Sequence, residues 1–248
     1  LSAEVSDAFP VPDWVPLTAK LGALLAVVVV FLVVGALVGI GWQLSHGYTH
    51  LEPGQYLATL ALQAIPFALL AVLAVFLQVL SNNKFLGYLL TIVWLVLSAI
   101  GFDLLHLEQH IYNYGTTPGA PYSDLNGYGH FLKGVLWFDF YWTACAVVLL
   151  ALAALFWVRG TGQSWRERLR EAGARLHAPA AAALALGLLA FVGSGGWIYY
   201  NTNVLNQFKS STTQKIEQAD YEKKYAKYKD APQPRITAVQ ADVDIYPY

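Results

Sequence analysis

The sequence predicts an all-α polytopic membrane protein of about five transmembrane helices, followed by a polar stalk helix and the first β-strand of a further domain. The first supporting observation is composition, because 56% of the 248 residues are hydrophobic and only 12% are charged. The second is a mean hydropathy of +0.45. A soluble domain of this size cannot bury so much apolar surface, so lipid must solvate much of the chain. The third is a change to polar residues after Tyr200.

A membrane-spanning helix needs about 20 mainly apolar residues. Five runs meet this requirement, at residues 17–44, 56–80, 85–105, 131–158 and 178–200. They leave residues 1–16 as an elbow before the first span, 106–130 as a long loop, and 159–177 as a second loop. Gly35 and Gly39 form a G-x-x-x-G pattern in the first run, which indicates a close helix contact with any neighbour.

Basic residues near the helix ends predict the orientation, since cytoplasmic loops are enriched in Lys and Arg. Loop 159–177 contains five arginines against two glutamates, and the arginines are Arg159, Arg166, Arg168, Arg170 and Arg175. We therefore expect this loop and the elbow 1–16 to be cytoplasmic. Loop 106–130 and the C-terminus are then expected outside.

The C-terminal region changes character twice. Residues 201–231 predict a polar stalk helix, with Asp220 placed four residues before Lys224, a stabilising spacing. Residues 232–248 then alternate apolar and polar side chains from Val239 onward, as an amphipathic strand does. An isolated strand is not stable, so we expect the rest of a β domain to follow Tyr248. The absence of methionine likewise leads us to expect that Leu1 is an internal position of a longer protein.

The candidate metal ligands are histidines, two pairs of which have the i, i+4 spacing that places both rings on one helix face. These pairs are His46 with His50 and His106 with His110. The second pair resembles the zinc-protease pattern H-E-x-x-H only superficially, because Leu107 stands where the general-base Glu belongs. Interfacial polar residues are therefore the favoured interpretation. A haem site is disfavoured, because these histidines cluster at one membrane boundary.

Two further groups of residues leave alternatives open. Asp103 and Asp139 lie near predicted helix ends, which favours interfacial anchoring over a proton or ion pathway. Loop 106–130 mixes glycine and proline with aromatic residues, which favours a structured cap over a substrate-contacting lid. Its candidate residues are Tyr122, Asp124, Asn126, Tyr128 and His130. No phosphate-binding G-x-x-x-x-G-K-[ST] occurs, so any ATP must be hydrolysed by another polypeptide.

Several strings resemble the bacterial ABC-2-type permeases that are fused to an M1-family aminopeptidase-like domain. They are NNKFLG (82–87), YSDLNGYGHF (122–131), YNTNVLN (200–206), PQPRIT (232–237) and VDIYP (243–247). The resemblance implies a bacterial inner-membrane protein with further helices before Leu1 and a periplasmic peptidase-like domain after Tyr248. It implies no catalytic residue and no cofactor in this chain, ATP on a partner ABC ATPase subunit, and a zinc site in the following domain.

In such permeases a cytoplasmic elbow meets the ATPase subunit. The corresponding residues are Pro10, Val11, Pro12, Asp13 and Trp14, and the arginine-rich loop is a weaker candidate because topology and anionic lipid already explain its charge. The expected partners are thus lipid, the ATPase, and other helices of the parent or a second permease copy; no feature indicates a nucleic acid. The alternative functions are a membrane anchor for a zinc aminopeptidase with no transport role, and a haem or redox subunit.

Overall fold

The computed structural model describes residues 14–157, 164–232 and 235–244. The chain divides into two compact units, Leu1–Gln207 and Phe208–Tyr248.

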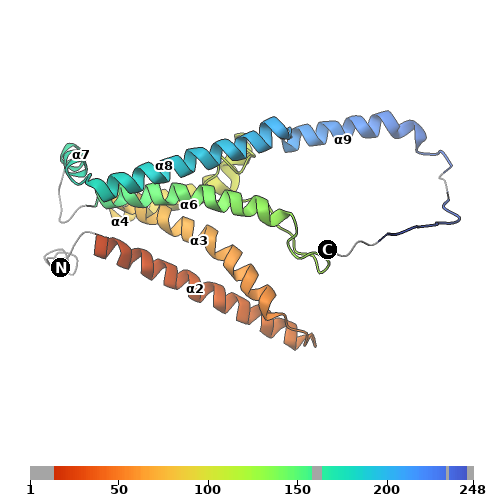
Figure 1. Cartoon of the computed structure of the whole chain (residues 1–248), viewed down its shortest axis with the longest axis horizontal. Coiled ribbons are helices and arrows are strands. Elements are labelled where there is room, and N and C mark those ends of the chain that lie inside the picture. The colour runs from red at the N-terminus through yellow and green to blue at the C-terminus, as the bar shows by residue number, and fades with distance from the viewer. Residues whose placement is uncertain (1–13, 158–163, 233–234, 245–248) are drawn as a thin grey trace. The chain divides into compact units, whose positions relative to one another are not determined.

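The described part of the first unit is helical, and it contains five helices long and apolar enough to span a membrane (Figure 1). They confirm the five runs predicted from the sequence, with ends that differ by a few residues. The spans are α2 (Trp14–Ser45), α3 (Pro53–Ser81), α4 (Lys84–Val96) with the π-helical segment η1 (Leu97–Gly101), α6 (Phe131–Leu155), and α8 (Ala178–Tyr199) with the π-helical segment η2 (Tyr200–Leu205). A three-residue helix, α5 (Phe102–Leu104), follows η1.

The turn between α3 and α4 shows how local sequence positions the spans. Asn82 ends α3 in the left-handed conformation, with a φ of 48°. Asn83 then caps α4, because its side-chain oxygen accepts hydrogen bonds from the backbone N–H groups of Phe85 and Leu86, at 2.9 and 3.3 Å. Four residues after this cap, Gly87 lies directly against Gln78 of α3.

The helix α6 occupies the centre of the first unit, where it packs against α8 and α3, and α3 packs in turn against α2 and α4 (Figure 1). Two clusters of buried side chains form the core. One contains Leu69, Val72, Phe138, Tyr141, Trp142, Ala146 and Ile198, and the other contains Leu17, Val75, Ala153 and Trp157. Most of α2 remains exposed and apolar, which fits a helix in contact with lipid.

A short polar helix, α7 (Trp165–Ala174), lies in the connection between α6 and α8. We refer to the end of the bundle where α7 lies as the α7 end. The opposite end, where residues 105–130 connect α5 to α6, is the loop end. Successive spans alternate in direction between these two ends, as a polytopic membrane protein requires (Figure 1).

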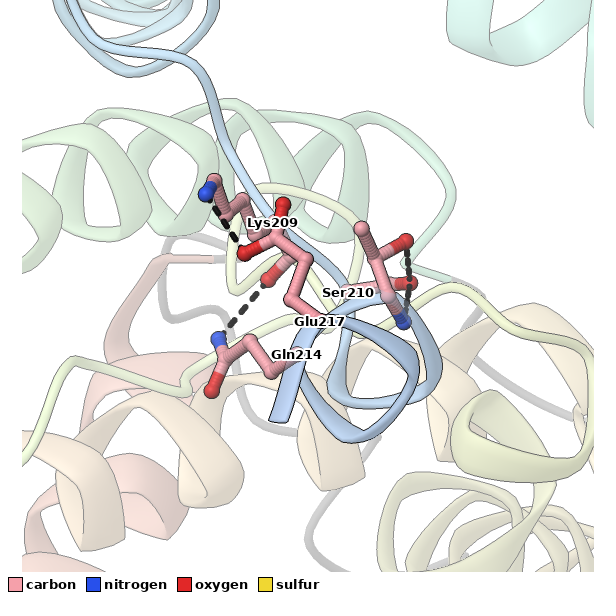
Figure 2. A network of polar contacts seen from close by, with 5 residues as sticks. Lys209, Ser210, Gln214 and Glu217 are labelled. Carbon is pink, nitrogen blue, oxygen red and sulfur yellow. Dashed lines mark hydrogen bonds and ion pairs between the residues drawn. The ribbon is translucent and has the colours of Figure 1, made fainter. Parts of the chain in front are cut away.

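The second unit contains α9 (Ser211–Tyr225), which continues as a 3₁₀ turn, η3 (Ala226–Tyr228). The start of α9 is stabilised by polar contacts: the Ser210 hydroxyl accepts a hydrogen bond from Thr213 N at 3.2 Å, and Lys209 Nζ lies 2.6 Å from Glu217 Oε2 (Figure 2). Gln214 Nε2 also donates to the Lys209 carbonyl at 3.0 Å.

Two features of the C-terminal region differ from the sequence predictions. The polar helix is shorter than the predicted stalk 201–231, because residues 200–205 extend α8 instead. No strand forms within residues 235–244, the described part of the segment that was expected to begin a β domain. A strand needs a hydrogen-bonded neighbour, and none of the described residues supplies one.

Candidate functional site

The residues expected to meet an ATPase are only partly described. Pro10, Val11, Pro12 and Asp13 lie outside the described residues, as does Arg159. Trp14 begins α2 and is 62% exposed. The candidate site at the α7 end is therefore built from the remaining arginines and the helix that carries them.

The helix α7 begins at a capping box. Glu167 N donates to Ser164 Oγ at 3.4 Å, and Ser164 N donates to Glu167 Oε2 at 2.8 Å. These hydrogen bonds with Ser164 hold the pKa of the Glu167 carboxyl below its usual value. A polar ten-residue helix thus forms outside the spans, and its exposed face carries Arg166, Leu169 and Arg170.

Arg168 points the other way and is only 5% exposed. Its Nη1 donates to Leu80 O at 2.8 Å, and its Nη2 donates to Val79 O at 2.7 Å and to Phe156 O at 3.2 Å. These carbonyls end α3 and α6, where the last turn of a helix lacks internal partners and carries negative partial charge. One guanidinium therefore caps two membrane spans and joins both of them to α7.

Neighbouring contacts reinforce this junction. Trp165 stacks on Phe156, with ring centroids 5.8 Å apart and an interplanar angle of 11°. Arg175 donates a hydrogen bond to Trp157 O, and Lys20 Nζ of α2 lies 4.7 Å from the centre of the Trp157 ring. The α7 end thus links α2, α3, α6 and α7. A displacement of α7 would be transmitted directly to the ends of α3 and α6.

Sequence reasoning assigned the arginines of this loop a common electrostatic role, and the structure separates them. Arg166 and Arg170 are exposed, whereas Arg168 and Arg175 bind the ends of spans. Two signals were present in the sequence. The S-x-x-E string at residues 164–167 is typical of a helix start, and Arg168 and Arg175 are seven residues apart, on one helix face.

At the loop end, residues 109–116 pack into the bundle, and we call them the inserted segment. Asn113 exchanges two hydrogen bonds with Ser98 of η1, at 2.8 and 3.0 Å. The Tyr114 hydroxyl donates to Leu69 O of α3 at 3.0 Å, and Trp142 Nε1 of α6 donates to Thr116 O at 3.0 Å. The inserted segment is thereby bonded to three different spans.

The remaining loop residues form a compact turn rather than a converging site. Ser123 and Gly127 exchange backbone hydrogen bonds of 2.9 and 2.7 Å. The rings of Tyr122 and Tyr128 lie 5.5 Å apart, and the Tyr128 hydroxyl is 2.8 Å from Thr59 Oγ1 of α3. Asp124 and Asn126 are exposed at the tip, and the His130 ring lies against Phe131, with centroids 4.1 Å apart. This geometry fits a cap fixed to α3; a lid that contacts substrate stays a prediction.

The histidines of the first candidate metal pair have separate polar neighbours. His46 Nδ1 is 2.9 Å from Trp42 O, and exposed His50 is 3.9 Å from Glu52. The prediction that His106 and His110 share one face of a helix is wrong, because both residues lie in turns and His106 has a φ of 57°. Among the described residues, no group of three or more histidine, cysteine or acidic residues could hold a metal ion.

Asp139 corrects another expectation. The sequence favoured an interfacial side chain near a helix end, but the Asp139 side chain is buried within α6 and only 5% exposed. Neither carboxylate oxygen has a hydrogen-bond partner in the described part of the chain. Asp103 lies in α5, at the loop end.

Comparisons with known protein families, with curated proteins and with solved structures find no match to this chain. The assignment of a function therefore rests on the five candidate spans and on the contacts at the two ends of the bundle.

Proposed function

We propose that the chain is the transmembrane permease segment of an ATP-driven, ABC-2-type transporter in a bacterial inner membrane. The observation that carries the proposal is the contact of Arg168 with the ends of α3 and α6. It fixes a polar helix to two spans, so that a force on α7 moves both spans together. The strings that resemble those of ABC-2-type permeases and the five candidate spans support the same function.

In this proposal, the α7 end is cytoplasmic and the exposed face of α7 contacts a separate ATPase subunit. Arg166 and Arg170 would supply the charged part of that contact and Leu169 an apolar part, since all three side chains are exposed. The elbow residues 10–14 would form a second contact. ATP binds to the partner, and this chain converts movement of the partner into rocking of α3 and α6 around the centre of the bundle.

Affinity purification of the protein from its native membrane tests the proposal. An ABC ATPase subunit is expected to co-purify with the wild type and to be lost from the double variant R166E/R170E. The matched control is K223E/K224E, which reverses two exposed charges of α9 in the other unit. It should retain the ATPase subunit.

Two outcomes would contradict the proposal. One is the absence of any ATPase from the wild-type preparation. The other is a chelator-sensitive aminopeptidase activity in a preparation that lacks an ATPase, which would identify the chain as the anchor of a zinc peptidase. If the ATPase subunit is lost equally from R166E/R170E and from K223E/K224E, the loss is not specific to α7, and α7 is not the contact.

A further inference from the structure

Asp139 is an acidic residue of the candidate span α6, and its side chain is buried among the packed helices. It lies eight residues after Phe131, about 12 Å along α6 from its start at a rise of 1.5 Å per residue. The side chain is 5% exposed, and both carboxylate oxygens lack a hydrogen-bond partner among the described residues. A buried polar atom without a partner is rare in native structures and points to a ligand or a function.

Two hydrogen-bond donors close to Asp139 on α6, Tyr141 and Trp142, already have other acceptors. The Tyr141 hydroxyl donates to Ile111 O at 3.3 Å, and Trp142 Nε1 donates to Thr116 O at 3.0 Å. Both acceptors belong to the inserted segment. Neither of these two donors therefore binds the Asp139 carboxylate, which agrees with the absence of a hydrogen-bond partner on both of its oxygens.

No charged residue on the elements packed against α6 pairs with Asp139. The arginines of α7 lie at the other end of α6, where Arg168 donates to Phe156 O. The helices α3 and α8 contain no acidic, basic or histidine residue; their only titratable groups are Tyr56 in α3 and Tyr199 in α8, followed by Tyr200 in η2. The titratable groups of the inserted segment are Tyr112, Tyr114 and His110. Lys133 of α6 is exposed, nearer the loop end. Burial lowers the pKa of His110, so its imidazole is neutral at neutral pH. No described residue forms an ion pair with Asp139.

An ionised carboxylate with neither a donor nor a cation is strongly destabilised in an apolar interior. We propose that Asp139 is a proton-binding site within the membrane, occupied by a proton in the conformation described. A bound proton removes the charge and gives the group an O–H donor. This proposal does not depend on whether the chain serves a transporter or an anchor.

The inserted segment separates this site from water at the loop end. The His110 ring lies 5.9 Å from the Phe138 ring, and Ile111 and Thr116 accept hydrogen bonds from Tyr141 and Trp142, so the segment contacts α6 on both sides of residue 139. The segment is held by the paired hydrogen bonds between Asn113 and Ser98 of the π-helical η1. Such π-helical segments recur at functional sites. Exchange of the proton therefore requires the segment to move.

Infrared spectroscopy of the purified, lipid-reconstituted protein tests the bound proton. At neutral pH, the wild type is expected to show the carbonyl stretching band of a protonated carboxylic acid, and D139N should lack that band. The matched control D124N removes an exposed carboxyl at the loop tip and should retain it. Absence of the difference between wild type and D139N would overturn the proposal, since Asp139 would then be ionised and paired with a cation from another helix.

Deuterium exchange tests the role of the inserted segment. The same band shifts when the acid proton is replaced by deuterium, so its rate of shift in D₂O reports access to water. N113A removes both hydrogen bonds to Ser98, and the shift should be faster than in the wild type by on the order of tenfold. N126A, in the exposed tip, should exchange at the wild-type rate. Equal rates in N113A and the wild type would show that the segment does not cover the site.

Discussion

At the scale of single residues, the first unit depends on a few side chains that cap or tie helix ends. Arg168 is the clearest example, since a guanidinium offers several donors in a planar fork and can serve carbonyls from two helices at once. The compact ammonium group of a lysine cannot reach all three carbonyl oxygens, those of Val79, Leu80 and Phe156. The stability of the α7 end should therefore depend on the shape of this side chain as well as on its charge.

Replacing Arg168 by alanine is expected to lower the free energy of unfolding by about 3 kcal/mol, because hydrogen bonds from a charged donor contribute about 1.5–3 kcal/mol each and are not additive. R168K should lie between R168A and the wild type. Thermal unfolding in detergent, followed by tryptophan fluorescence, measures the change. The exposed control R170A should stay within about 0.5 kcal/mol of the wild type. A loss in R170A as large as that in R168A would show that the hydrogen bonds of Arg168 to α3 and α6 do not stabilise the α7 end.

Tyr114 offers a second test at this scale, in the inserted segment. Y114F removes only the hydroxyl that donates to Leu69 O, and should cost about 0.5–1.5 kcal/mol of unfolding free energy. Y112F, in the same segment, removes the hydroxyl of an exposed tyrosine and should lower the free energy of unfolding by less. The same unfolding measurement separates them, and a larger loss in Y112F would show that the segment is held in another way.

At the scale of elements, the approach of α4 to α3 depends on the missing side chain of Gly87. A Cβ added there would lie 2.6 Å from Gln78 Cγ and 2.9 Å from Gln78 Cα, and the second atom belongs to backbone that cannot rotate away. We expect G87A to lower the free energy of unfolding by about 1–3 kcal/mol through overpacking. G193A in α8 meets nothing within 4 Å, so it should leave stability unchanged or raise it by up to about 1 kcal/mol. Chemical denaturation in mixed micelles would compare the pair, and equal effects would contradict a close helix contact.

The capping box of α7 predicts a dependence on pH. The folded-state pKa of Glu167 lies below its ordinary value of 4.5, so its contribution is present above that value and is lost as the pH falls through the folded pKa. At neutral pH, E167Q should exchange the amide hydrogens of residues 165–174 faster than the wild type, after correction for intrinsic rates. The two proteins should become equal in acid. A difference that persists unchanged in acid would exclude the ionised capping box as its cause.

At the scale of the whole molecule, the spans were predictable because each must satisfy the length and apolar composition that a bilayer imposes. Contacts between residues distant in sequence could not be predicted in this way. Counting arginines indicates a side of the membrane, but the count does not distinguish Arg168, which caps α3 and α6, from exposed Arg170. Similarly, no periodicity pairs Asn113 with Ser98 or encloses Asp139, because those arrangements arise only when the loop returns into the bundle.

The order of the elements along the chain predicts on which side of the membrane each end of the bundle lies. One candidate span, α6, separates the loop end from α7, so we expect the two to lie on opposite sides of the membrane. After the native thiol is removed by C145A, the single-cysteine variants D124C and R170C place exposed thiols at the two ends. In intact inverted and right-side-out vesicles, a membrane-impermeant maleimide should label each variant in only one orientation, and the orientations should be opposite. The five arginines of loop 159–177 further predict that R170C reacts from the cytoplasmic side. Labelling of both variants from the same side would mean that α6 does not cross the bilayer.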